Sequence, residues 1–214
     1  MIRSGGRWLA GACALVALGG CASAPVHYYT LVAPDTQASG NVAVQAAAPG
    51  ALPFAVSPVG VPAQADQPQL VVRDGEQRVL LLDGERWIAP LGDELRNALA
   101  ADLARELRSP NTTGLSDSGA PGLRIKLDVR RFDSWPGSYA LLAGTWSVRV
   151  VHGKDHAPAQ EAAVTCASTV REPVGAGYAA LVQGHQRAIA TLAGEMAVVA
   201  RALAAGRPAA CPST

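Results

Sequence analysis

The histidines of this sequence are the first residues to examine for chemistry, because imidazole can bind a metal or carry a proton. Two of the four, His152 and His156, stand four residues apart in HGKDH. Two histidines at that spacing share a face only in a helix. Here Gly153 lies between two strand-like stretches, which favours a hairpin turn over a metal site. His185 lies on the apolar face of a predicted helix and is interpreted as a core residue, so no metal ligand is assigned.

The hydroxyl and acidic residues do not form a catalytic pattern. Ser57 and Ser134 have no identifiable base, and no GxSxG sequence occurs. The stretch GAGYAA at 175–180 lacks the third glycine and the lysine of phosphate-binding loops, which indicates a strand-to-helix turn. Asp128 and Asp133 are not a convincing acid–base pair, because Asp128 belongs to a solvated strand face. The sequence therefore predicts no catalytic residue, no cofactor and no enzymatic activity.

Aromatic side chains gather around one Pro-Gly turn in FDSWPGSYALLAGTW, residues 132–146. We expect Trp146 to fill the core. Trp135 and Tyr139 lie at the turn, where such side chains are either core residues or anchors for a partner or lipid.

A leader precedes the predicted domain. Residues 1–20 combine two arginines with a short apolar run, which is typical of a secretory signal and too short to span a bilayer. The run ends in LGGC, which resembles a bacterial lipobox, so we expect lipidation of Cys21; ordinary secretion with a chance cysteine is the alternative. Ala22 stands where aspartate would resemble an inner-membrane retention signal. The predicted location is therefore the periplasmic face of the outer membrane, with residues 21–26 as the tether.

Two of the four cysteines remain once the leader and the lipidated residue are set aside. Cys166 and Cys211 form an even pair in an oxidising compartment, which predicts a disulfide that holds the tail 206–214. Two free thiols are the alternative.

The bulk composition limits the class of protein. The 214 residues are 49% hydrophobic and 5% aromatic, with a formal net charge of +1. Loss of the leader removes two arginines and no acids, which leaves about −1 and gives no electrostatic argument for nucleic acid. The length suits one domain, expected over 27–205.

Short strands are predicted in the first half of the domain. Residues 27–32 and 54–59 are rich in β-formers, and the small residues 33–53 between them predict a flexible connection. Two further stretches, QLVVR and RVLLLDG, predict a hairpin with its turn at Asp74 and Gly75.

Two helices and three longer strands follow. Leucines recur at every fourth residue from Leu91 to Leu107, and a second apolar seam runs over about 176–204. Alternating patterns predict strands at 123–129, 141–151 and 161–172. The predicted fold is α+β, with a mostly antiparallel or mixed sheet of about five to seven strands and two main helices packed on one face.

The stretch PVGVPAQADQPQLVVR, residues 58–73, holds three prolines between two predicted strands. Proline fixes φ and removes a donor, so the loop loses little entropy when it is held in one shape. We predict that residues 59–69 lie at a subunit or partner interface, and a rigid internal connection is the alternative. The proposed contact residues are Pro58, Val59, Pro62, Asp66, Pro68 and Gln69.

Several of these stretches together resemble the PqiC family of auxiliary lipoproteins. They are the lipobox, YYTL, the proline-rich block, RWIAPLGDELRNALAADLARELRS, VRRFDSW with LLAGTWSV, and GYAALVQGHQRAIATLAGEMA. Where the family often carries a YLDRPQ-like run, residues 64–68 of this chain lack the aromatic residue and the arginine.

The resemblance implies an outer-membrane lipoprotein that works with an MCE-domain protein of the Pqi type in lipid transport. That partner forms a tube across the periplasm, and the lipoprotein docks it at the outer membrane as a homo-oligomeric ring, without catalysis. One alternative is a structural or assembly-type envelope lipoprotein with no transport role. Another is a lipid- or metal-binding module that uses HGKDH or the aromatic hairpin.

Overall fold

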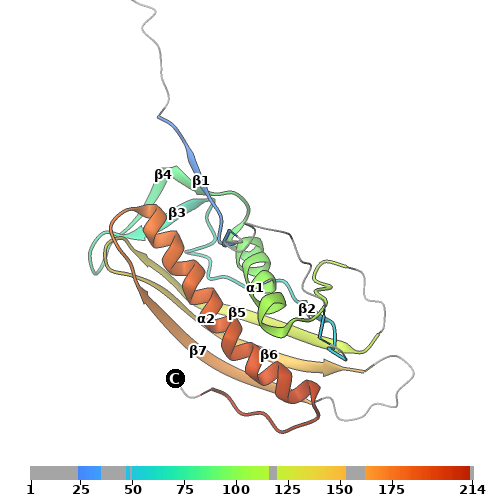
Figure 1. Ribbon diagram of the computed structural model, residues 1–214. Helices are drawn as coiled ribbons and strands as arrows, with labels where there is room; N and C mark the ends of the chain where they lie inside the picture. Colours follow the sequence, from blue (N-terminus) through green and yellow to red (C-terminus); the bar gives the residue numbers. More distant parts are fainter. Residues whose placement is uncertain (1–23, 35–46, 49, 116–119, 153–161, 213–214) are drawn as a thin grey trace, which may run out of the picture.

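Seven strands and two helices follow one another in the computed structural model, which describes residues 24–34, 47–48, 50–115, 120–152 and 162–212 (Figure 1). The predicted α+β class is confirmed. The elements are β1 (His27–Tyr29), β2 (Phe54–Val56), β3 (Gln69–Arg73), β4 (Val79–Trp87), α1 (Leu91–Leu107), β5 (Gly122–Trp135), β6 (Tyr139–Val151), β7 (Ala163–Pro173) and α2 (Tyr178–Ala204).

The larger sheet has the strand order β2-β5-β6-β7. Its last three strands are antiparallel, whereas β2 runs parallel to β5. Leu123, Ile125 and Leu127 are buried while Arg124 and Lys126 between them are exposed, so alternation along β5 places one face toward the core.

The smaller sheet has the order β1-β4-β3, with β1 parallel to β4 and β3 antiparallel to it. The predicted hairpin between β3 and β4 is present. Its turn closes with a 3.0 Å hydrogen bond from the Asp74 N–H to the Arg78 carbonyl oxygen. Gly75 in this turn has a φ of 99°, a conformation that glycine adopts without a Cβ clash.

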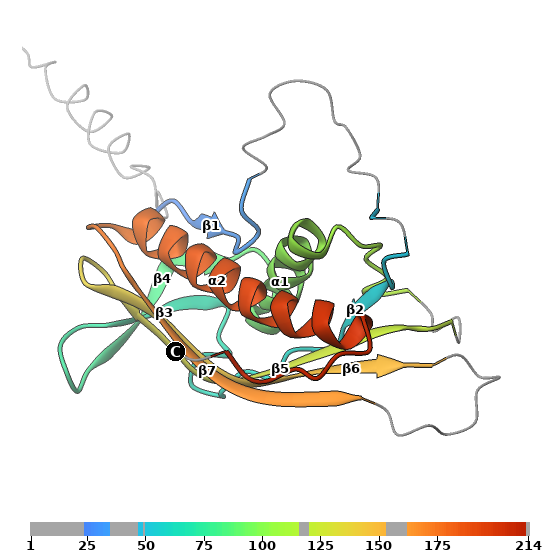
Figure 2. The same cartoon turned by 60° about the horizontal axis from the view of Figure 1, so that its bottom comes forward.

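Both helices lie on one face of the larger sheet (Figure 2). Helix α2 packs on β6 and β7, and α1 packs on α2. The leucine repeat of α1 supplies Leu95, Leu99 and Leu103, none of which is exposed, and Trp146 of β6 is buried with them in the same core. The apolar seams that predicted the helices therefore also form the core.

The strands differ from the expectation in one respect, since they form two sheets with one parallel pair in each. The strands that make the parallel pairs, β1 and β2, have three residues each. A three-residue stretch carries too little alternation to specify its neighbour, and a parallel partner is distant in sequence.

Candidate interaction surfaces

The proline-rich segment after β2 follows the edge of β5. Gly60 forms a parallel bridge with Asp128, and the Val129 N–H donates to the Gly60 carbonyl oxygen over 2.8 Å. The Pro62 carbonyl oxygen then accepts from the Ala65 N–H, also over 2.8 Å, in a turn that buries Ala65. The segment is thus held to β5 by backbone hydrogen bonds.

The prolines explain why the ladder along β5 stops. Because proline has no N–H, it cannot extend a ladder of backbone hydrogen bonds. Among the six proposed contact residues, three are exposed and three are half-buried. Their role at an interface stays a prediction. Pro58, Asp66 and Pro68 are the exposed residues, and Val59, Pro62 and Gln69 are the half-buried ones.

The aromatic hairpin between β5 and β6 is stabilised within the chain. The rings of Trp135 and Tyr139 pack edge to face with centroids 5.6 Å apart. The guanidinium of Arg171 lies over the Tyr139 ring, 3.9 Å from its centroid. Both aromatic side chains are half-buried, so they support the turn and also present part of their surface to solvent.

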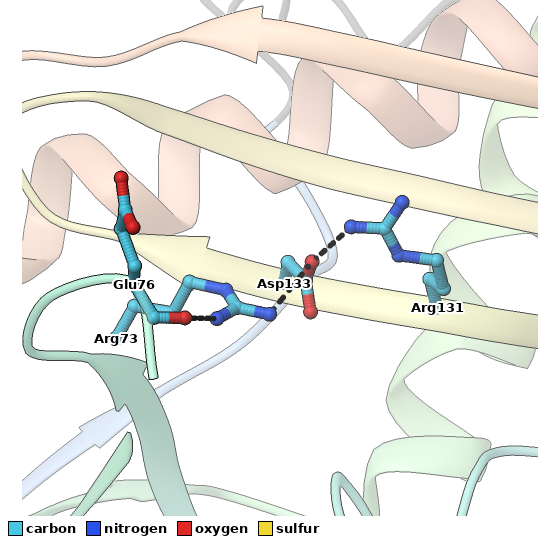
Figure 3. A network of polar contacts seen from close by, with 4 residues as sticks. All are labelled: Arg73, Glu76, Arg131 and Asp133. Atoms are coloured by element: carbon cyan, nitrogen blue, oxygen red, sulfur yellow. Dashed lines mark hydrogen bonds and ion pairs between the residues drawn. The ribbon is translucent and has the colours of Figure 1, made fainter. Parts of the chain in front are cut away.

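A charged network joins the two sheets beside this hairpin (Figure 3). Asp133 of β5 accepts from Arg73 of β3 over 3.4 Å and from Arg131 over 2.6 Å. A second nitrogen of the Arg73 guanidinium donates to the Glu76 carbonyl oxygen over 3.0 Å. Because one carboxylate is shared by two guanidiniums, the network fixes the β3–β4 hairpin against β5.

Ser134 has a base beside it, which the sequence did not indicate. The Ser134 hydroxyl lies 2.8 Å from Nε2 of His185, whose ring stacks on Phe132 at a centroid distance of 3.9 Å. Burial lowers the pKa of His185 to about 3, against a smaller opposing effect of Asp133. Both partners are buried, and Nδ1 of His185 has no hydrogen-bond partner within the described chain. The pair is a core hydrogen bond, since a serine nucleophile needs access to substrate.

Glu94 of α1 holds the segment that follows β1. This buried carboxylate accepts from the Leu31 N–H over 2.7 Å and from the Thr30 hydroxyl over 2.8 Å. Leu31 is buried beside it. Helix α1 therefore fixes the path of the chain as it leaves the smaller sheet.

Cys166 and Cys211 form a disulfide in the structure, with their Cα atoms 5.5 Å apart. Cys166 is a buried residue of β7, and Cys211 belongs to the tail after α2. Both views show this tail returning alongside β7 (Figures 1 and 2). The covalent bond thus closes a 45-residue separation around α2.

Three residues considered in the sequence for lipidation or metal binding have no defined site in the structure. Cys21 and His156 lie outside the described residues, and His152 is exposed. The described residues contain no group of three or more histidine, cysteine or acidic side chains placed to hold a metal. Over the same residues, no helix is long and apolar enough to cross a membrane.

These features define a class of protein: a small α+β domain closed by a disulfide, with its rigid connection and aromatic turn partly at the surface. The family model for the ABC-type transport auxiliary lipoprotein component matches residues 29–197. The chain belongs to this family. The family is one of auxiliary lipoproteins of ABC-type transport systems, which confirms the broader part of the sequence prediction.

Solved structures share the fold at low sequence identity. An uncharacterized protein aligns with a TM-score of 0.61 and 17% identity over 84% of this chain and 99% of its own. Protein XCC0632 from Xanthomonas campestris aligns with a TM-score of 0.51 and 19% identity over 81% and 93% of the two chains. No curated protein matches the chain.

Proposed function

We propose that this chain is an outer-membrane lipoprotein that docks an MCE-domain protein of the Pqi type on the periplasmic side of the membrane. In this role it serves lipid transport between membranes and supports envelope integrity. The family match over residues 29–197 carries the proposal, because it identifies a lipoprotein that assists a transporter.

The proposed anchor is Cys21, at the end of the lipobox. Residues 21–26 separate it from β1, which begins at His27. Six extended residues span at most about 22 Å, so a lipid on Cys21 keeps the domain close to the bilayer. A docking subunit requires this arrangement, with its lipid in the membrane and its partner on the periplasmic side.

The proposed docking surface combines residues 58–69 with Trp135 and Tyr139. The connection is fixed by backbone hydrogen bonds and the aromatic turn by ring contacts, so neither has to be ordered when a partner binds. Preorganised contacts of this kind reduce the entropic cost of association. A homo-oligomeric ring would repeat this surface around the end of the partner's tube.

Crosslinking in intact envelopes tests the proposal. A photo-reactive residue at Asp66 or Trp135 should capture an MCE-domain protein or a second copy of this chain, identified by mass analysis. The matched control is Val198, an exposed apolar residue on α2. Capture of other envelope proteins alone from Asp66 and Trp135 would instead favour the structural or assembly-type lipoprotein.

A second experiment tests the anchor independently. Cys21→Ala should release the protein from the outer-membrane fraction, because the described chain contains no helix that could replace the lipid. If the variant still fractionates with the outer membrane, the assignment of Cys21 is wrong.

A further inference from the structure

The large exposed apolar side chains are concentrated on the smaller sheet. Among the described residues, six of the nine lie on β1, on β4 or within one residue of these strands, and each is 45–60% exposed. An exposed apolar group on this scale marks a contact surface more often than a single exposed leucine does. We name these six the β1–β4 patch: Val26, Tyr28, Val79, Leu80, Leu81 and Ile88.

Strand β4 links the members of this group: Val79, Leu80 and Leu81 lie at its start, and β1 pairs with its last residues. Strand β1 lies beside β4 with His27 opposite Glu85 and Tyr29 opposite Trp87. The chain before β1 also stays near β4, since a Cβ added at Gly84 would lie 3.5 Å from the Pro25 carbonyl oxygen. Figure 1 shows β1, β3 and β4 together at one end of the molecule, away from β2 and the end of α2.

The start of β4 is unusual for a strand because consecutive side chains are exposed. Val79, Leu80 and Leu81 are 55%, 46% and 50% exposed, so both faces of this stretch are apolar and open. β3 pairs with one edge of residues 79–82, and no strand of the described chain pairs with the other edge. An edge of this kind normally carries charge or is covered.

We propose that the β1–β4 patch lies against the lipid bilayer and sets the orientation of the domain on the membrane. The inference rests on the proposed lipidation of Cys21. Val26 is five residue steps from Cys21, so the patch begins no more than about 18 Å from the anchored residue. The tether therefore holds this end of the molecule closest to the membrane.

The charge around the patch requires an apolar mode of contact. Residues 69–88 carry three arginines and four acidic residues, a balance of −1. Attraction to anionic lipid is therefore not the source of binding, and a zwitterionic bilayer should suffice with little effect of salt. Tyr28 suits the interface, because its ring is apolar and its hydroxyl can remain hydrated.

The open backbone edge limits how deeply the patch inserts. Backbone N–H and C=O groups without a partner are costly in hydrocarbon, whereas water and headgroups satisfy them at the interface. The patch therefore lies at the headgroup layer with its aliphatic side chains directed toward the acyl chains. The end with β2 and the last turns of α2 then points away from the membrane.

Depth-dependent fluorescence quenching in the full mature lipoprotein tests this orientation. Tyr28→Cys and Leu81→Cys each introduce a single reactive thiol, because Cys21 is acylated and the other two cysteines form the disulfide. Val198→Cys is the matched control, since Val198 is 59% exposed and lies on α2. Each variant is labelled with an environment-sensitive fluorophore and reconstituted in phosphatidylcholine vesicles containing a shallow or a deep nitroxide lipid.

We expect the shallow quencher to reduce the fluorescence at positions 28 and 81 and to leave position 198 unchanged. The deep quencher should have less effect, and added salt should not restore the signal. Equal quenching at all three positions would overturn the proposal. The proposal would also be overturned if the labels at positions 28 and 81 were shielded from quencher to a degree that depends on the protein density on the vesicles and not on the lipid. That result would assign the patch to a contact with a second copy of the chain.

Two controls separate this inference from the proposed function. Flotation with vesicles that is lost in Cys21→Ala reports the anchor alone, so an anchored protein with unquenched positions 28 and 81 refutes only the patch. Hydrogen exchange of the unsubstituted protein gives a readout without labels. Amides of residues 79–83 should exchange more slowly on vesicles than in the unanchored Cys21→Ala form, and equal rates would contradict the proposal.

Discussion

Removal of the disulfide should destabilise the domain through the unfolded chain rather than through lost contacts. Cys166 and Cys211 are separated by 45 residues, and closing a loop of that length is worth about 4 kcal/mol in the chain-entropy treatment. A reduced Cys166 can remain buried as a small apolar side chain, so the core itself loses little. Loosening of the tail should add to this destabilisation only the loss of the contact between the half-buried Ala209 and the core.

Urea unfolding with and without a reductant measures this effect through the fluorescence of the buried Trp87 and Trp146. With a typical urea dependence of about 2 kcal/mol per molar, reduction should lower the midpoint by about 2 M. Cys211→Ala is the control, because it should unfold like the reduced protein and be insensitive to reductant. If oxidised, reduced and substituted proteins share one midpoint, the entropic reasoning fails.

Three further predictions concern the core. Gly144→Ala should destabilise by about 1–3 kcal/mol, because its Cβ would lie 2.7 Å from the Asp128 carbonyl oxygen, whereas Gly194→Ala, with open space in α2, should stabilise by up to about 1 kcal/mol. Thermal unfolding of the two variants measures this difference, and equal changes in stability for Gly144→Ala and Gly194→Ala would refute the prediction. Glu94→Ala should cost about 2–3 kcal/mol in urea, because the buried Leu31 N–H loses its acceptor, and a cost below about 0.5 kcal/mol would refute the assigned bond. The pKa of His185 is lowered to about 3, so the unfolded chain takes up the proton first and stability falls as pH drops from about 6.5 toward 3, by up to about 1.4 kcal/mol per pH unit. His185→Gln should flatten that profile, and an unchanged slope would assign it to other groups.

Local periodicity predicted the elements that carry most of the core. The leucine repeat and the final apolar seam became α1 (Leu91–Leu107) and α2 (Tyr178–Ala204), with their apolar residues buried. The three alternating stretches became β5, β6 and β7; β5 and β6 are longer than predicted, and β7 begins two residues later and ends one residue later than predicted. These patterns succeed because burial of one face is a local property of a long helix or strand.

Pairing between distant short strands could not be predicted in this way. β2 joins β5 across about 70 residues of chain through a three-residue register, and β1 joins β4 in the same manner. The proline block illustrates the same limit at the candidate site. Its stiffness was evident from composition, but the bridge of Gly60 to Asp128 depends on where β5 lies. The sequence therefore favoured a contact surface and an internal connection equally.

The pair of Ser134 and His185 was missed for a related reason. The two residues are 51 positions apart and belong to a strand and a helix whose packing brings them within 2.8 Å. The available signals were the polar Ser134 in an aromatic strand and the polar His185 in an apolar helical seam. Each was interpreted alone, whereas a buried polar side chain requires a partner and the two satisfy each other.

The run of aliphatic residues in RVLLLDG illustrates how a correct strand prediction can still miss the function of a surface. A strand with four consecutive aliphatic residues would ordinarily be expected to face a core on at least one side. Here Leu82 packs against the core while Val79, Leu80 and Leu81 are exposed, so folding of this one chain does not explain their composition. Contact with a bilayer explains these exposed apolar side chains, because the tether that precedes the adjacent strand holds them close to the membrane.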